Sequence, residues 1–404
     1  MLLGLLTIAM VAAMLAIHPF VTYPASLMVL RRWPRSGAPR PAAGGAPGAA
    51  RPRRVAVCFC AYNEAGVIAD KIANLRALHA LMPDLAIHCY VDGATDGTDE
   101  ILSRHADLIR LTVSSERRGK TFGMNLLVDQ TDADIVIFTD ANVLVPPEGI
   151  PRLLEYFDDP EVGCVCGHLI YVNPHESATS RNGALYWRLE EFTKRLESDT
   201  GSVVGADGSL FAIRRALHPS VPDAIIDDMF VSLSIMCAGF RVISAPDVLS
   251  FERAATSARD EFRRKIRIAC QAFNVHRLLW PQLRRLPPIA LYKYVSHRLV
   301  RWFSIYFVAL CGLASFGALG VLTNFVSASL ITLCGVVAMA LAHRLGVAPV
   351  RQACDILLAM LGVGIGVIWS LRGERFVVWN PAGSVRAARG MVDPGVQPQR
   401  PAMR

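Results

Sequence analysis

The chain has 404 residues, of which 52% are hydrophobic and 19% charged, and its formal net charge is +8. This apolar composition argues against an ordinary soluble protein and favours a soluble domain joined to membrane segments. Nucleic-acid binding explains the positive charge less well, because Lys and Arg gather beside the apolar segments rather than on a patch interleaved with aromatic residues. The ten cysteines contain no C-x-x-C pair, which is typical of small core residues in a reducing compartment.

The first apolar segment covers residues 2 to 30, and no basic region precedes it. We therefore expect residues 1 to 30 to form a retained transmembrane anchor rather than a cleaved signal peptide. Residues 31 to 53 are rich in Pro, Gly, Ala and Arg, so a flexible basic linker is expected there. A cytoplasmic position for the following domain is favoured by the arginines after the anchor: Arg31, Arg32, Arg35, Arg40, Arg51, Arg53 and Arg54.

Strand and helix patterns then alternate within a domain expected to span residues 54 to 285. Strands are expected at 54 to 62, 86 to 92, 108 to 114 and 134 to 140, with helices near 65 to 80, 97 to 105 and 119 to 130. This alternation predicts an α/β fold with parallel strands, whose ligands bind at the carboxyl ends of the strands. Polar residues stand at three of those ends: Asn63-Glu64, Asp92 and Asp140.

The end of the chain is expected to meet the membrane. The stretch "DEFRRKIRIACQAF" predicts an amphipathic helix near 260 to 285, which can lie on anionic lipid and still direct one Arg at a diphosphate. A C-terminal transmembrane region is expected at 286 to 371, with apolar stretches at 302 to 323, 326 to 342 and 353 to 371. Three crossings would place the basic tail at 372 to 404 outside the cytoplasm, so we expect one stretch to lie in the interface or re-enter.

Several polar residues are placed where ordinary fold stability does not explain them. No G-x-G-x-x-G follows the first strand, which counts against a dinucleotide-binding oxidoreductase. Lys120 opens a helix, where a cation opposes the helix dipole, so an anionic ligand is indicated. Asp140 ends the apolar run of "IVIFTDANVL", and Asn142 stands where a two-carboxylate metal clamp would have its second acid.

Two further pairs lie on predicted helices. Asp227 and Asp228 open one of them, and since adjacent side chains point about 100° apart, one can cap the helix while the other enters a pocket. Arg264 and Arg267 are three residues apart and therefore share a helix face.

Taken in order, the motifs "AYNE", "VDGATDGT", "RRGK", "FTDAN", "GADGSLFAIRR", "IIDDMF" and "RRKIRIA" resemble the membrane-bound family 2 glycosyltransferases with a GT-A fold. That family includes cellulose, hyaluronan and poly-N-acetylglucosamine synthases and enzymes that transfer one sugar to a lipid. The resemblance implies a Rossmann-like mixed sheet and an inverting transfer from a nucleotide-diphosphate sugar, a UDP-hexose or UDP-N-acetylhexosamine. The implied acceptor is a polysaccharide or a lipid-linked glycan of envelope or exopolysaccharide synthesis, at the cell inner membrane in a multi-pass protein with a cytoplasmic catalytic domain.

The same resemblance implies roles for individual residues. The nucleotide sugar would be bound by Ala61, Tyr62, Asn63, Glu64, Asp92, Lys120 and Asp140. Asp228 would be the catalytic base, with Asp227 beside it and Arg267 on the leaving-group side. The acceptor side would include Gly205, Asp207 and Arg264. A divalent cation, Mg²⁺ or Mn²⁺, would be held by Asp140 and Asn142.

Three departures from the family pattern leave alternatives open. Asn142 replaces an Asp, the residues around Arg267 lack the Gln and Trp of processive synthases, and Asp207 stands where a neutral residue is expected. Polysaccharide extension and single transfer to a lipid both remain open, as do export or synthase partner subunits. Tyr186 and Trp187 would contact sugar, lipid or the core. The alternative function is a catalytically weak membrane subunit that binds a nucleotide sugar and regulates a partner synthase.

Overall fold

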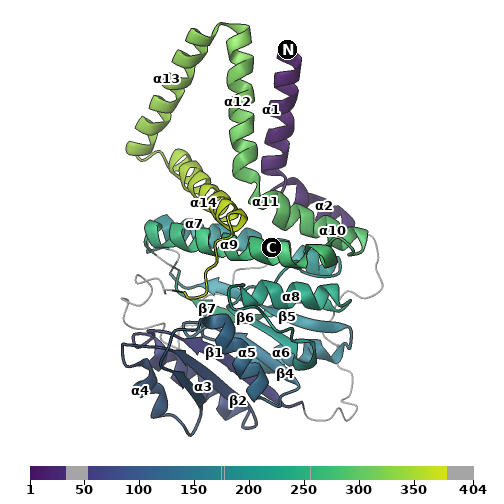
Figure 1. The fold of residues 1–404 in the computed structure, drawn as a ribbon, viewed down its shortest axis with the longest axis vertical. Coiled ribbons are helices and arrows are strands. Elements are labelled where there is room, and N and C mark those ends of the chain that lie inside the picture. Colours follow the sequence, from purple (N-terminus) through teal and green to yellow (C-terminus); the bar gives the residue numbers. More distant parts are fainter. Residues whose placement is uncertain (33–52, 174, 177, 255, 380–404) are drawn as a thin grey trace.

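The computed structural model describes residues 1–32, 53–173, 175–176, 178–254 and 256–379. Most of the expected linker at 31 to 53 and of the expected tail at 372 to 404 lies outside the described residues. A mixed α/β domain forms one half of the molecule, and long apolar helices stand together on one side of it (Figure 1).

The domain is built on one seven-stranded sheet with the order β3-β2-β1-β4-β6-β5-β7. Strand β6 is antiparallel to β4 and β5, whereas β1 pairs in parallel with β2 and β4, and β5 pairs in parallel with β7. The sheet is therefore mixed, as the family resemblance implied. The strand bounds are β1 Val55–Ala61, β2 Ala86–Asp92, β3 Arg110–Ser114, β4 Ile135–Thr139, β5 Val162–Tyr171, β6 Leu210–Arg214 and β7 Arg241–Glu252.

Helices cover both faces of this sheet. One face carries α3 Ile68–Leu81, α4 Thr98–Ser103 and α6 Gly149–Glu155, and the other carries α5 Lys120–Gln130, α8 Asp227–Cys237 and α9 Ala258–Leu283. Short 3-10 turns follow α6 at Tyr156–Asp158 and β6 at Arg215–Leu217, and α7 spans Ala178–Asp199. The strands and helices predicted between residues 54 and 140 are thus confirmed, with bounds shifted by a few residues.

The core explains the cysteine pattern of β1 and β5. Cys58, Cys60, Cys164 and Cys166 are free and buried, and all four pack into the hydrophobic cluster shared with α5 and α8. Alternate positions of a strand face the same side of the sheet, which is why these small side chains gather in one layer. The prediction that they are core residues is confirmed.

The expected anchor is not one straight helix. Residues 2 to 30 form α1 Leu2–Ile17 and α2 Thr22–Leu30, bent by 62°. Pro19 lies in the break, where it cannot donate a backbone hydrogen bond and disfavours helical geometry in the residue before it. The expected transmembrane anchor at residues 1 to 30 stays a prediction, and the helix that would form it is broken at this point.

The second apolar region contains the remaining helices: α10 Pro288–Tyr294, a π-helical turn Val295–Leu299, α11 Val300–Trp302, α12 Ser304–Leu322, α13 Phe325–Arg344 and α14 Ala348–Leu371. Helices α12, α13 and α14 are each long and apolar enough to cross a membrane, and α1 with α2 would add a fourth span if the bent pair counts as one. Helix α12 runs beside α1, and α14 returns toward α9 (Figure 1).

Helix α14 packs tightly on α9. A Cβ added at Gly366 would lie 2.5 Å from the carbonyl oxygen of Ile266 and 2.7 Å from Cβ of Ala269, so only glycine permits this approach. Hydrogen bonds reinforce the contact: Ser370 donates to Asn274 at 2.6 Å, and Arg277 donates to the Ser370 carbonyl at 2.6 Å. The chain then continues from α14 along α9 into the α/β domain as residues 374 to 379.

Candidate functional site

Asp140 and Lys120 meet at the carboxyl end of the central strands. Asp140 directly follows β4, Lys120 begins α5, and the ammonium lies 2.7 Å from the Asp140 carboxylate. Burial opposes protonation of Lys120, but the charges of Asp140, Asp227 and Asp228 outweigh it and raise the pKa of this lysine. The lysine is therefore a fixed positive charge among three carboxylates.

The acidic pair at the start of α8 faces the same place. Both Asp227 and Asp228 are buried, and Oδ2 of Asp227 has no hydrogen-bond partner among the described residues. Oδ1 of Asp228 accepts from the amide of Met229, the next residue of α8, at 2.5 Å. Burial, followed by the charge of Asp227, raises the pKa of Asp228 to about 7, which suits a general base near neutral pH.

Gly208 lies between Asp228 and Lys120. A Cβ at this position would lie 3.0 Å from Oδ2 of Asp228 and 3.2 Å from Nζ of Lys120. The missing side chain therefore leaves space between Asp228 and the Lys120–Asp140 pair, where the reacting groups of two substrates could meet.

Arg267 approaches this space from α9. Its guanidinium donates to Gln271 at 3.2 Å, and burial together with the neighbouring Arg264 lowers its pKa to about 10, against the opposing charges of Asp140 and Asp228. Arg267 remains a cation at neutral pH and lies within electrostatic reach of both carboxylates.

Asn142 has a carboxylate neighbour that sequence reasoning missed. Its amide donates to Oε1 of Glu252 at 3.0 Å, and Glu252 lies at the end of β7. Burial raises the pKa of Glu252 to about 7, with Arg264 acting in the opposite direction and Asp140 adding to the rise. The available sequence signal for Glu252 was that it is an acidic residue at the end of a long strand. The fold is needed to show that it lies beside Asn142.

These residues form the oxygen-rich part of the site. Asp140 and Glu252 offer carboxylates and Asn142 offers an amide, a donor set of the kind that hard divalent cations accept. Lys120 already occupies the cation position against Asp140. Across the described ranges, no group of three or more His, Cys, Asp and Glu side chains lies at metal-ligand spacing. Further ligands for a cation would therefore have to come from a substrate or water.

The wall of the site that adjoins this space is built around Asp92, which is fully buried. Oδ1 of Asp92 accepts from the amides of Arg118 at 2.7 Å and Gly119 at 3.1 Å, so the carboxylate shapes the loop before α5. Asn63, whose φ is +52°, accepts from the Thr95 amide at 2.8 Å and joins the loops after β1 and β2. Ala61 is buried at the end of β1, and Glu64 is buried just beyond it.

Aromatic and cationic groups cover this wall. The Arg117 guanidinium lies 3.5 Å from the centre of the Tyr62 ring, and the Trp379 ring meets Tyr62 edge-on at 6.1 Å. Arg117 also donates to the Trp379 carbonyl. Gln271, which holds Arg267, donates to the Phe376 carbonyl at 2.9 Å. The segment 374 to 379 therefore lies against this wall of the site.

Gly205 and Asp207, two of the predicted acceptor-side residues, lie in the same tightly braced loop as Gly208. Arg298 donates to the carbonyls of Val204 at 2.7 Å and Gly205 at 3.3 Å. Asp207 forms an ion pair with the buried Lys194 and accepts from Ser209. These contacts give Asp207 structural partners, which the sequence did not reveal. The charge of Asp207 also raises the pKa of Asp228.

Lys71 is a second residue that sequence reasoning missed. It is 1% exposed, and its ammonium donates to the Val143 carbonyl at 2.7 Å and lies 3.4 Å from Oγ1 of Thr139. Burial lowers its pKa to about 7, although the charge of Asp140 acts in the opposite direction. Lys71 thus braces the loop that carries Asp140 and Asn142. Its helical sequence context does not distinguish it from a surface lysine.

The structure brings most of the predicted site residues to one end of the sheet. Lys120, Asp140, Asp227, Asp228 and Arg267 surround one space, and Tyr62, Asn63 and Asp92 form its adjoining wall. Arg264 lies farther out, 3.5 Å from Glu261, and its charge acts on Glu252.

Comparisons with known proteins show what the sequence and the fold resemble. Residues 56–221 match the family model described as Glycosyl transferase family 2. Over 193 residues the chain is 26% identical to poly-beta-1,6-N-acetyl-D-glucosamine synthase of Staphylococcus aureus, and the match covers 46% of each protein. An N-acetylglucosaminyltransferase of Rhizobium meliloti is 24% identical over 197 residues, again with 46% of each covered. The matched part thus spans about half the length of these curated relatives.

A solved structure is similar over more of the chain. The mannosyltransferase of Pyrobaculum calidifontis, solved in complex with GDP-Man and Mn²⁺, gives a TM-score of 0.68 at 22% sequence identity. The match covers 90% of this chain and 99% of that one. It supports a GT-A type of fold for the α/β domain.

Proposed function

We propose that this chain, whose residues 56–221 match the model of glycosyl transferase family 2, is a membrane-bound inverting transferase that uses a nucleotide-diphosphate sugar. The observation that carries the proposal is the placement of Asp228 across Gly208 from the Lys120–Asp140 pair. One side of that gap can accept a proton, and the other can hold a diphosphate.

In the proposed reaction Asp228 acts as the base. It takes the proton of an acceptor hydroxyl, whose oxygen attacks the anomeric carbon as the bond from that carbon to the diphosphate oxygen breaks. The nucleoside diphosphate leaves with the bonding electron pair. Lys120 and Arg267 stabilise the negative charge that grows on it, because both remain cationic in a partly buried setting. An α-linked donor then gives a β-linked product.

We propose that the donor base lies against the wall of Tyr62, Arg117 and Trp379, where a flat ring can stack. The names of the curated relatives support N-acetylglucosamine as the transferred sugar, and we propose a UDP-linked donor for it. The GDP-Man bound by the mannosyltransferase makes GDP-mannose the main competitor.

A divalent cation fits the same site. We propose that Asp140, Glu252 and Asn142 would hold Mg²⁺ or Mn²⁺ together with the donor diphosphate. The Mn²⁺ in the similar mannosyltransferase structure supports this. Such a cation would neutralise charge on the leaving group.

The membrane position is also part of the proposal. The apolar helices α12 and α13 would cross the membrane as a pair, while α14 stays at the boundary against α9. The contacts of residues 374 to 379 with the catalytic domain support this, because they keep the end of α14 on the catalytic side. The arginines after α2 favour the cytoplasmic face of a cell inner membrane.

The test is nucleotide release by the purified full-length protein in lipid, measured with a panel of UDP- and GDP-sugars with and without Mn²⁺. We expect release with one UDP-sugar, dependence on the cation, and loss of release in Asp140→Ala. Donor binding without any release across the panel would contradict the proposal and favour a regulatory subunit instead.

A further inference from the structure

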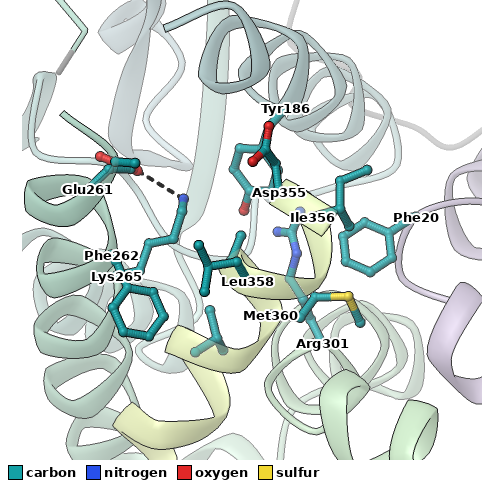
Figure 2. Close-up of a pocket in the computed structure, with 13 residues that line it drawn as sticks. Phe20, Tyr186, Glu261, Phe262, Lys265, Arg301, Asp355, Ile356, Leu358 and Met360 are labelled. Carbon is teal, nitrogen blue, oxygen red and sulfur yellow. Dashed lines mark ion pairs between the residues drawn. The ribbon is translucent and has the colours of Figure 1, made fainter. Parts of the chain in front are cut away.

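Lys71 on α3 is buried, and among the described residues no carboxylate forms an ion pair with it. The cavity drawn in Figure 2 shows the contrast, because Lys265 there pairs with Glu261 at 2.9 Å and Asp355 lines the same cavity. Beside the Lys71 ammonium lies instead the ring of Phe59, whose centre is 5.6 Å away. A charge buried in this way is costly for stability, which indicates a specific role for this lysine.

The ammonium of Lys71 lies at the start of the loop that follows β4. It donates to the Val143 carbonyl at 2.7 Å and lies 3.4 Å from Oγ1 of Thr139, the last residue of the strand. The Thr139 hydroxyl in turn donates to the carbonyl of Ser209 at 2.9 Å, in the loop before β6. Lys71 therefore holds the loop after β4 directly and reaches the loop before β6 through one hydroxyl.

Asn74 holds the same loop from the same helix. Its side-chain amide donates to the Val145 carbonyl at 2.6 Å, and its side-chain oxygen accepts from the Val145 amide at 3.0 Å. Asn74 follows Lys71 by three residues, so the two side chains share a face of α3. The helix thus holds two alternate positions of the loop, 143 and 145.

The residue between these positions is held from β7. Leu144 exchanges two backbone hydrogen bonds with Phe251, at 3.0 and 2.8 Å. Phe251 directly precedes Glu252, which accepts from the Asn142 amide at 3.0 Å. The loop that carries Asp140 and Asn142 is therefore tied alternately to α3 and to β7, and its side chains are fixed relative to Glu252.

The charge of Lys71 and its hydrogen bonds would act in opposite directions on a cation at Asp140. The charges of Lys71 and Asp140 act on each other, so a cation beside Asp140 would also be repelled by the ammonium. Hydrogen bonds that orient metal ligands favour binding instead. Removal of the lysine would thus tighten cation binding if its charge dominated and weaken binding if its hydrogen bonds dominated.

We propose that Lys71 and Asn74 are positioning residues of the cation site. From α3 they hold the loop after β4, so that the side-chain oxygens of Asp140, Asn142 and Glu252 keep one geometry before a cation and the donor diphosphate bind. Ligands that are already oriented bind a metal more tightly, because less order has to be created on binding. This inference rests on the proposed function, since it explains how the cation site of that function keeps its shape.

The test is Mn²⁺ affinity, measured by electron paramagnetic resonance of free Mn²⁺ with full-length protein in phosphatidylcholine nanodiscs and with UDP or GDP present. Lys71→Met removes the ammonium and keeps an unbranched side chain. Asn74→Leu removes both hydrogen bonds to Val145 without any change of charge. We expect each variant to weaken Mn²⁺ binding about tenfold, because substitutions behind metal ligands have effects of this size.

Two control variants remove matched contacts elsewhere in the chain. Lys293 is also buried and donates to the carbonyls of Glu197 at 2.8 Å and Ser202 at 3.0 Å. Asn125 forms the same reciprocal pair of hydrogen bonds with Val221, at 2.7 and 3.3 Å. Lys293→Met and Asn125→Leu should lower the Tm but leave Mn²⁺ affinity unchanged.

Unchanged or tighter Mn²⁺ binding in Lys71→Met would overturn the inference while leaving the proposed function in place. Thermal unfolding identifies a variant that fails to fold, and if Lys71→Met is one, unchanged binding in Asn74→Leu overturns the inference in the same way. Equal weakening in the loop variants and the controls would also overturn it, since affinity would then follow stability alone. No Mn²⁺ binding by the unmodified protein with either nucleoside diphosphate would sink the proposed function, and this inference with it.

Discussion

The amide of Asn142 donates to Glu252, a residue 110 positions later in the chain. The sequence alone left Asn142 as an imperfect second half of a two-carboxylate clamp. In the fold, strand β7 places the carboxylate of Glu252 beside Asn142. Under the proposed function, Asp140 and Glu252 would be the two carboxylates of the clamp, although they are distant along the chain.

This arrangement predicts how cation binding responds to substitution. Glu252→Gln removes a hard, charged oxygen and should weaken Mn²⁺ binding about tenfold or more, while Asn142→Asp adds one and should tighten it. Binding is measured by electron paramagnetic resonance of free Mn²⁺ in the presence of nucleoside diphosphate. Glu155→Gln, on the exposed end of α6, is the matched control. Unchanged affinity in both site variants would exclude Glu252 as a ligand.

Asp228 predicts the pH dependence of the reaction. Its pKa is raised to about 7 by burial and by Asp227, so below that pH the carboxyl is protonated and cannot accept the acceptor's proton. We expect kcat/KM to fall about tenfold per unit on the acid side and to level off above it. Asp227→Asn removes a neighbouring negative charge and should move the midpoint to lower pH. A midpoint that does not move in this variant would contradict the coupling of the two acids.

At the scale of elements, the strands and helices from residue 54 to 140 could be predicted from the sequence. Each strand is an apolar run with turn residues at its end, and amphipathic helices lie between the strands, so local sequence alone specifies each element. The positions of Lys71, Glu252 and Trp379 do not follow, because each depends on packing between distant segments. Lys71 is the clearest case, since a lysine on a helix predicts solvent exposure, whereas the fold buries it to brace the loop after β4.

The packing of α14 on α9 gives an element-scale prediction. Gly366→Val introduces a side chain whose Cβ would meet backbone atoms of α9 at 2.5 and 2.9 Å, so the helices must separate. We expect a loss of about 1 to 3 kcal/mol in stability, typical of overpacking, seen as a lower Tm in detergent. Gly335→Val on α13 is the control, because nothing lies within 4 Å of its added Cβ. Equal Tm values for the two variants would argue against close α9–α14 packing.

At the scale of the whole molecule, a buried polar cluster joins the apolar helices to the catalytic domain. Glu197 of α7 accepts from the Tyr23 hydroxyl of α2 at 2.5 Å, lies 2.7 Å from Nδ1 of His297 and accepts from the Val204 amide at 3.0 Å. One carboxylate thus connects α2, the π-helical turn and the segment leading to the acceptor loop. Through this carboxylate, the apolar helix α2 is joined directly to the α/β domain.

Removing one contact of that cluster tests the link. Tyr23→Phe keeps the ring and deletes a hydrogen bond to a charged acceptor, so it should lower stability by about 1.5 to 3 kcal/mol. Tyr292→Phe is the control, because its hydroxyl meets the neutral hydroxyl of Ser26 at 2.6 Å, and its loss should cost about 1 kcal/mol. Thermal unfolding of the two variants in the same lipid measures the difference. A larger loss in Tyr292→Phe would contradict the importance of Glu197.

The central claim is that Asp228 removes the acceptor's proton while the donor is held on the other side of Gly208. The direct measurement compares sugar transfer and donor affinity in Asp228→Asn, which preserves shape but cannot act as a base. We predict a fall in kcat of about 10² to 10⁴ with donor Kd unchanged. Transfer at the original rate in this variant would contradict the account.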